Sequence, residues 1–270
     1  MNNTFNINRF GLLLKRQWLD FGKVYLGTLV VLTGILIICY WFLMPSTDRI
    51  YFSDKNRPDL QFRYLLFMFL GFFFTSIIAS NYFNNLGQKA NSILELMTPA
   101  STFEKFLTAI FYTSIVSVCS FLLVFYLVDL AFVTLLNASL NPEQTAAIHS
   151  GQAKPAQSML SEILRDQTAL RYFGYNLISP FTVTSIFLLG SIYFKRFHYI
   201  KTAIVVILFT VLWVSLTFYF MNLMIADTVW IGNQYWHNDS HIFLIFSLVA
   251  LVVTIAFWIT TYIRLKEKEV

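Results

Sequence analysis

Residues 106–128 read "FLTAIFYTSIVSVCSFLLVFYLV", a run of 23 residues without a charged side chain. A helix advances by about 1.5 Å per residue, so this run is about 34 Å long as a helix. The hydrocarbon core of a bilayer is about 30 Å thick and is crossed by about 20 helical residues. Residues 106–128 therefore predict a membrane-spanning helix.

Five further runs are of similar length and equally free of charge. The six predicted spans are 24–44, 65–83, 106–128, 173–194, 202–224 and 242–263. Of the whole chain, 57% is hydrophobic and only 12% is charged, whereas about a quarter of the residues in soluble domains are charged. The sequence thus predicts an all-α polytopic membrane protein with a single transmembrane domain over residues 1–270. No arginine-rich arm is present, and nucleic acid is not an expected partner.

Lys and Arg residues are distributed unevenly among the segments that flank these spans. Twelve lie in the two terminal segments and in the connections between spans two and three and between spans four and five, against seven in the other connections. Positively charged connections tend to stay in the cytoplasm, so both termini are predicted to be cytoplasmic. The longest connection, 137–172, is then external, and we expect it to form a small cap with a short helix after Pro155.

The polar segment before residue 106 has its own pattern, because "LELMTPASTFEKFL" (94–107) is broken at Pro99. Residues 84–98 place apolar side chains on one helical face, namely Leu86, Ala90, Ile93, Leu94 and Met97. Lys89, Ser92 and Glu95 occupy the other face. Pro99 ends this helix, and Ser101 with Glu104 forms a capping box that starts the next one. The sequence therefore predicts a cytoplasmic amphipathic helix, which either covers lipid headgroups or docks a partner.

The N-terminal segment shows a similar division into faces. Its apolar residues recur at helical spacing, namely Ile7, Phe10, Leu14, Trp18 and Phe21. Its cationic residues are Arg9, Lys15, Arg16 and Lys23. This pattern is typical of a helix that lies in the membrane surface. The alternative is that residues 9–23 are simply the basic start of the first span.

No residue pattern for catalysis, cofactor binding or metal binding is found. The chain lacks a phosphate-binding G-x-x-x-x-G-K-[ST] loop and the H-E-x-x-H and G-x-S-x-G motifs, so we do not expect an enzyme. His237 and His241 are spaced i, i+4 but lack a third ligand, and we interpret them as part of a polar loop. Asp129, just past the third span, is expected to contact lipid headgroups. Asn176 and the other span asparagines, Asn81 and Asn222, are expected to bond between helices.

The combined arrangement resembles the permease subunit of ABC-2-type ABC transporters. The stretch Leu96–Leu107, "LMTPASTFEKFL", is similar to the "LPAS…EKFL" segment of ABC-2-like permeases and of related Bacteroidetes membrane proteins. The resemblance implies a bacterial inner-membrane exporter that works with a separate ATP-binding subunit and with a second permease half, identical or paralogous. It further implies that the amphipathic helix is the coupling helix, with the docking residues Leu86, Lys89, Ala90, Ile93, Leu94, Glu95 and Met97.

Two other classes of function stay open on the sequence. One is a non-transporting membrane scaffold or assembly subunit, in which the cytoplasmic helix binds some other partner. The other is a secondary transporter or channel, which usually places an ionisable residue within the membrane. Only Asp129 approaches this description, and its position at the edge of the third span favours a headgroup contact instead. An ATP-driven partner is therefore favoured over a secondary transporter.

Overall fold

The computed structural model describes residues 5–44, 60–83, 100–151, 154–194, 197–225 and 239–269. Every regular element in these ranges is a helix. The helices are α1 (Ile7–Leu43), α2 (Phe62–Tyr82), α4 (Thr102–Ile110), η3 (Phe111–Val116), α5 (Ser117–Ala138), α6 (Pro142–His149), α7 (Met159–Arg165), α8 (Gln167–Asn176), α9 (Ser179–Tyr193), α10 (His198–Ile225) and α11 (Asp239–Glu269).

Within the described ranges, six helical segments are long and apolar enough to cross a membrane. They are Ile7–Leu43, Phe62–Tyr82, Thr102–Ala138, Gln167–Tyr193, His198–Tyr219 and Ile242–Lys268. Each coincides with one predicted span, which confirms the all-helical class and the six membrane-length helices. The short helix expected after Pro155 is also present, as α7.

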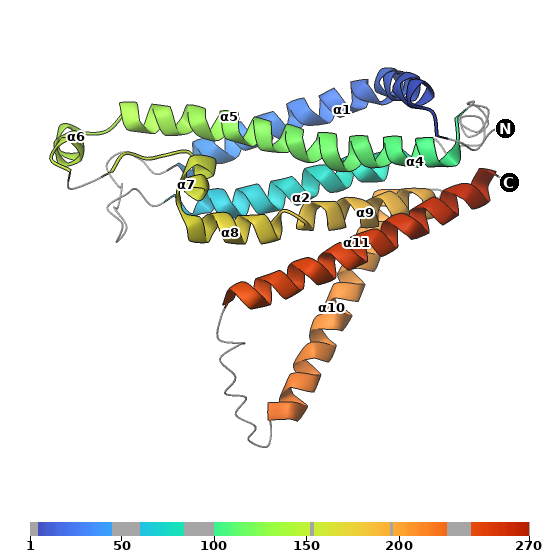
Figure 1. Ribbon diagram of the computed structural model, residues 1–270. Coiled ribbons are helices and arrows are strands. Elements are labelled where there is room, and N and C mark those ends of the chain that lie inside the picture. The colour runs from blue at the N-terminus through green and yellow to red at the C-terminus, as the bar shows by residue number, and fades with distance from the viewer. Residues whose placement is uncertain are drawn as a thin grey trace.

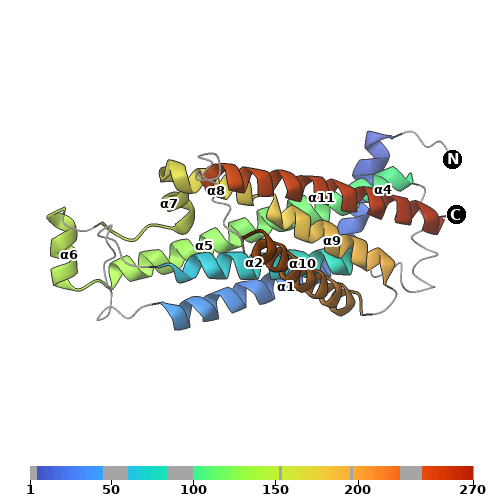
Figure 2. The ribbon, with the colours of Figure 1, turned by 90° about the horizontal axis from the view of Figure 1, so that it is seen from below.

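The helices form a bundle whose main members run roughly side by side. Figures 1 and 2 show α1, α2, α4 to α5, and α8 to α9 roughly aligned, with the start of α1 and the end of α11 at the same end of the bundle, and α11 packs against α9. The core between them is rich in aromatic rings and aliphatic side chains, including Tyr25, Tyr40, Ile78 and Phe125. Below, the end where α4 begins is called the α4 end, and the end covered by α7 is called the α7 end.

Helix α10 leaves the bundle at a wide angle, as Figure 1 shows. It contacts α9 only near its start, where a Cβ added to Gly190 would lie 2.0 Å from the Oγ1 atom of Thr202. Glycine is therefore needed for this close approach of the two helices. From Ile204 to Tyr219 its large apolar side chains are exposed on all sides. A helix that is apolar all round but not covered by protein is suited to a lipid environment.

Helix α1 differs from the sequence prediction in its boundaries. We predicted a surface helix over residues 9–23 and a separate span from residue 24, but one helix runs from Ile7 to Leu43. Its 37 residues correspond to about 55 Å, well beyond the hydrocarbon thickness. Figures 1 and 2 show that its first turns point away from the direction of the rest. The Trp18 indole lies over Gly22, 3.3 Å from where a Cβ would stand.

The third membrane-length helix contains a π-helical turn, η3, between α4 and α5. Small hydroxyl side chains surround it: Thr113 Oγ1 donates to the Ala109 carbonyl at 2.7 Å, and Ser117 Oγ donates to the Thr113 carbonyl. Ser114 is bonded across to Thr184 of α9 at 2.9 Å. Side chains that bond to the preceding turn are known to distort helices, and single π turns occur mostly as such local bulges.

Candidate functional site

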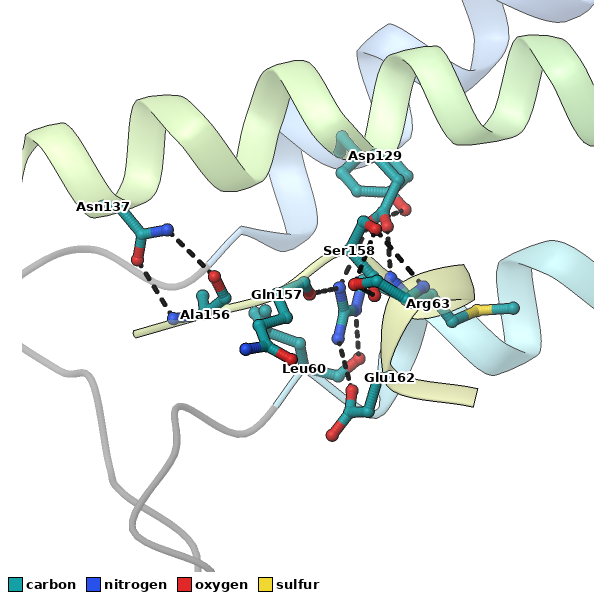
Figure 3. A network of polar contacts seen from close by, with 11 residues as sticks. Leu60, Arg63, Asp129, Asn137, Ala156, Gln157, Ser158 and Glu162 are labelled. Atoms are coloured by element: carbon teal, nitrogen blue, oxygen red, sulfur yellow. Dashed lines mark hydrogen bonds and ion pairs between the residues drawn. The ribbon is translucent and has the colours of Figure 1, made fainter. Parts of the chain in front are cut away.

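A buried cluster of charged side chains joins four helices at the α7 end (Figure 3). Its centre is the ion pair between Arg63 of α2 and Asp129 of α5, with Nη1 and Oδ1 3.2 Å apart. Arg63 is 3% exposed and Asp129 is 1% exposed. Arg63 Nη2 also contacts Glu162 Oε2 of α7 at 3.2 Å. Figure 3 shows that the guanidinium lies between the two carboxylates.

Backbone groups and one hydroxyl complete the contacts of this cluster. Arg63 donates from Nη1 to the Gln157 carbonyl at 2.8 Å and from Nε to the Leu60 carbonyl at 3.2 Å. Asp129 Oδ1 accepts from the Tyr40 hydroxyl of α1 at 2.9 Å. Its Oδ2 accepts from the Met159 amide of α7 at 2.6 Å. Both buried charges are thus paired and hydrogen-bonded, which is the condition under which proteins retain them.

This geometry corrects the prediction for Asp129. We expected its carboxylate to contact lipid headgroups, but α5 continues past Asp129 to Ala138, and residues 154–166 fold over it. Arg63, which the sequence places with the outer-loop cations, is instead buried in the first turn of α2. The sequence did contain a signal for this pair. Arg63 and Asp129 have opposite charges, and both lie at the outer edge of a predicted span, Arg63 just before span two and Asp129 just after span three. Ionisable residues in such places normally face the bundle interior and pair with each other.

The segment between α6 and α7 is fixed by Asn137, which lies near the end of α5. Its Nδ2 atom donates to the Ala156 carbonyl at 2.9 Å, and its Oδ1 atom accepts from the Ala156 amide at 3.0 Å (Figure 3). One amide side chain therefore satisfies both backbone groups of Ala156. Asn137 therefore fixes the residue directly before Gln157, whose carbonyl binds Arg63.

An apolar cavity of about 320 Å³ lies beside the cluster. Five helices form its walls. They contribute, among others, Phe67 of α2, Phe121 of α5, Met159 of α7, Phe173 of α8 and Pro180 of α9. Met159 belongs to both features, because its amide binds Asp129 while the residue also lines the cavity. The cavity and the cluster therefore share helix α7 as a common wall.

A second buried carboxylate, Glu104, lies at the α4 end and is 0% exposed. The predicted capping box is present: the Glu104 amide donates to Ser101 Oγ at 3.2 Å, and the Ser101 amide donates to Glu104 Oε2 at 2.9 Å. Glu104 Oε1 in addition accepts from the Asn6 amide at 2.9 Å and from Arg9 Nη2 at 3.0 Å. The start of α4 is thus fastened to the start of α1.

The other residues expected at the N-terminal helix are mostly at the surface. Lys15 and Lys23 are exposed, and Arg16 forms a loose i, i+4 pair with Asp20 at 3.8 Å. Trp18, one of the apolar residues of this helix, is 40% exposed, and its ring stacks on Tyr112 with centroids 6.2 Å apart. Trp18 therefore helps to pack α1 against the third membrane-length helix.

Several predicted residues lie outside the described residues. These are the docking residues Leu86, Lys89, Ala90, Ile93, Leu94, Glu95 and Met97, together with His237 and the side chain of His241. Asn176 does not bond between helices as predicted, since its Nδ2 atom donates to the Tyr172 carbonyl of its own helix at 3.2 Å. Among the described residues, no three His, Cys, Asp or Glu side chains are grouped closely enough to hold a metal ion.

Comparison of the chain with known protein families, with curated proteins and with solved structures gives no match. The class of this protein is therefore inferred from its fold alone. Six apolar helices of membrane length, with large apolar side chains exposed along α1, α5, α10 and α11, define a multi-pass helical membrane protein.

Proposed function

We propose that this chain is the permease subunit of an ATP-driven ABC-2-like exporter of the bacterial inner membrane, with both termini in the cytoplasm. It would work with a separate ATP-binding subunit and with a second permease half. The "LMTPASTFEKFL" stretch and the six membrane-length helices support this proposal. In such an assembly the ATP-binding subunit would engage residues 84–98 through Leu86, Lys89, Ala90, Ile93, Leu94, Glu95 and Met97.

The observation that carries the proposal is the fastening of α4 to α1 through Glu104. Residues 84–98 come shortly before Ser101, the N-cap of α4. Glu104 binds the Ser101 amide, the Asn6 amide and Arg9 with one carboxylate. A force applied to residues 84–98 therefore reaches both the third membrane-length helix and the N-terminal helix. This is the connection that a coupling segment requires in order to move more than one helix.

The buried Arg63–Asp129 cluster supports the other half of this mechanism. It ties α1, α2, α5 and α7 together at the α7 end. Helices that are fastened at both ends move as one body rather than sliding past each other. Nucleotide-driven closure of two ATP-binding subunits would then rock two such bodies against each other, as in other hinge or rigid-body transitions.

Co-purification tests the proposal directly. The full chain, tagged and expressed in its native host, is expected to bring down an ATP-binding cassette subunit. Exchanging charges by Lys89→Glu and Glu95→Lys is expected to weaken this association, whereas Lys15→Glu, on exposed α1 surface, leaves it intact as a control. The proposal would be contradicted if the tagged chain is purified without any ATP-binding subunit and the variant with both Lys89→Glu and Glu95→Lys keeps full activity. If a gene for an ATP-binding cassette subunit is found beside this gene, that finding would support the proposal.

A secondary transporter is the second candidate, and one observation favours it. Asp129 and Arg63 form a buried ion pair at the edge of the membrane-length helices, and such pairs often belong to ion or proton pathways. Ion-dependent flux in liposomes that contain this chain alone would favour that function, particularly if Asp129→Asn abolishes it. A chain that shows no flux alone and none with an ATP-binding subunit would instead be a membrane scaffold.

A further inference from the structure

We propose that the apolar cavity of about 320 Å³ binds one acyl chain of a bilayer lipid. The site lies between α2, α5, α7, α8 and α9, next to the Arg63–Asp129 cluster. This inference goes beyond the proposed function, and it does not depend on an ATP-binding partner. It rests on the chemistry of the lining, on the length of the cavity along α2 and on the lining residues that are exposed on the outer surface.

The lining offers almost no hydrogen-bonding capacity to a ligand. The Thr75 hydroxyl donates to the Gly71 carbonyl at 2.8 Å, and the Ser179 hydroxyl donates to the Asn176 carbonyl at 2.6 Å. Asn176 Nδ2 donates to the Tyr172 carbonyl at 3.2 Å. Most other lining residues are aromatic or aliphatic. A water molecule needs two to four polar partners in such a place, so the lining selects an apolar occupant.

The cavity has the depth of one bilayer leaflet. On α2 its lining runs from Tyr64 to Thr75, which is about 16 Å along the helix axis. Half of a hydrocarbon core about 30 Å thick is about 15 Å. The length of the cavity along α2 therefore matches that of a single lipid chain in one leaflet.

Two residues that line the cavity are also exposed on the outer surface of membrane-length helices. Met68 of α2 is 38% exposed and Leu177, after α8, is 45% exposed, and both also line the cavity. An added Cβ at Gly71, which also lines the cavity, would come within 2.8 Å of the Phe121 ring. Glycine at this position therefore lets the Phe121 ring pack closely against the backbone of α2 and form part of the wall.

An empty cavity of this kind would lose dispersion contacts on all its walls. Dry apolar cavities of about 150 Å³ already bind molecules of the size of benzene, and this cavity is about twice as large. Lipid chains surround the protein at very high concentration and need no pathway through water to reach it. The acyl chain is therefore the occupant that the site and its surroundings both favour.

Photo-crosslinking with a defined probe tests this site. The full chain in nanodiscs is incubated with a long-chain fatty acid that carries a diazirine near the end of its alkyl chain, is illuminated, and is analysed by peptide mass spectrometry. Adducts are expected on residues 64–75 and 118–122, and unlabelled palmitic acid should reduce them. The exposed surface of α10, residues 204–219, serves as the reference for ordinary lipid contact, where unlabelled palmitic acid should have no saturable effect.

Matched variants separate the cavity from the lipid-facing surface. Leu122→Trp fills the cavity from α5 and is expected to reduce the saturable adducts roughly tenfold, which equals about 1.4 kcal/mol of binding. Leu123→Trp places the same residue on the adjoining surface, where Leu123 is 60% exposed, and should leave them unchanged. Ala169→Phe fills the cavity from α8 and keeps the test valid if the first variant does not fold.

Two results would overturn the acyl-chain proposal. In the first, the adducts on residues 64–75 are not saturable and match those on α10, which makes the cavity ordinary lipid-facing surface. In the second, residues 64–75 stay unlabelled while a cross-linker joins two copies of the chain at Met68. A second copy would then cover Met68, and no lipid chain would occupy the cavity.

Discussion

The two ends of the bundle each contain a buried carboxylate with an arginine partner, but the two pairs are built differently. At the α7 end, the side chains of Arg63 and Asp129 are 4% and 1% exposed. At the α4 end, Glu104 is 0% exposed while the side chain of Arg9 is 35% exposed. Glu104 binds two backbone amides, those of Asn6 and Ser101, whereas Asp129 binds one.

This difference indicates which partner stabilises each buried carboxylate. Backbone amides stay in place when a side chain is replaced, so Glu104 keeps most of its contacts without Arg9. Asp129 depends on a cation that is itself out of water, and removing that cation leaves an uncompensated buried charge. The α7 end is therefore expected to respond to substitution far more strongly than the α4 end.

The largest effect is expected for Arg63→Met. It leaves Asp129 and Glu162 without their shared cation, and the free energy of unfolding should fall by about 3–5 kcal/mol. Thermal unfolding of the purified protein in detergent measures this change. Arg171→Met, at an exposed position on α8, is the matched control and should stay within about 0.5 kcal/mol. The double variant Arg63→Met, Asp129→Leu should recover much of the loss, and an unchanged Tm for Arg63→Met alone would refute the argument.

Glu104→Gln is expected to have the second largest effect. The amide keeps one acceptor oxygen but replaces the other with a donor, so one of the donors around Glu104 loses its acceptor in a buried place. The expected cost is about 1–3 kcal/mol, measured by the same thermal unfolding. Glu267→Gln is the control, because its bond to Arg264 at 2.7 Å lies on the surface and is worth less than about 1 kcal/mol. Equal effects of the two variants would show that Glu104 does not fasten α4 to α1.

Arg9→Met should cost less, about 1 kcal/mol, since it removes one partly exposed hydrogen bond. The Asn6 and Ser101 amides still bind Glu104 in this variant. The two ends are compared most directly by the ratio between the losses of unfolding free energy caused by Arg63→Met and by Arg9→Met. If Arg9→Met destabilises the protein as strongly as Arg63→Met, the Asn6 and Ser101 amides do not suffice to stabilise the buried Glu104 carboxylate.

Asn137→Ala is expected to change overall stability least, by roughly 1 kcal/mol or less, but to have a clear local effect. Without Asn137 Oδ1, the Ala156 amide loses its acceptor and should exchange its hydrogen faster. The Met159 amide keeps Asp129 as its acceptor and should remain protected. Hydrogen exchange measured by mass spectrometry distinguishes these two amides, and parallel loss of protection at both would mean that Asn137 organises the whole cluster.

Much of the fold could be predicted from the sequence because the responsible patterns are local. An uncharged run of about 20 residues identifies a membrane helix without knowledge of its neighbours, and the six runs correspond to the six helices. The capping box is equally local, because Ser101 and Glu104 are three residues apart. The predicted separation of residues 9–23 from the first span is not seen as a break, since nothing in residues 9–24 interrupts the helix that continues through them.

Only the tertiary structure decided how the polar residues are used. Arg63 and Asp129 are 66 residues apart in the chain, and Arg9 and Glu104 are 95 apart, so no periodic pattern relates them. A charge at the edge of a span appears the same in sequence whether it faces lipid headgroups or an oppositely charged partner. Which of the two occurs depends on the packing of neighbouring helices and on the segment that covers them. The sequence by itself thus determined the membrane helices, and tertiary packing determined that Asp129 is buried beside an apolar cavity.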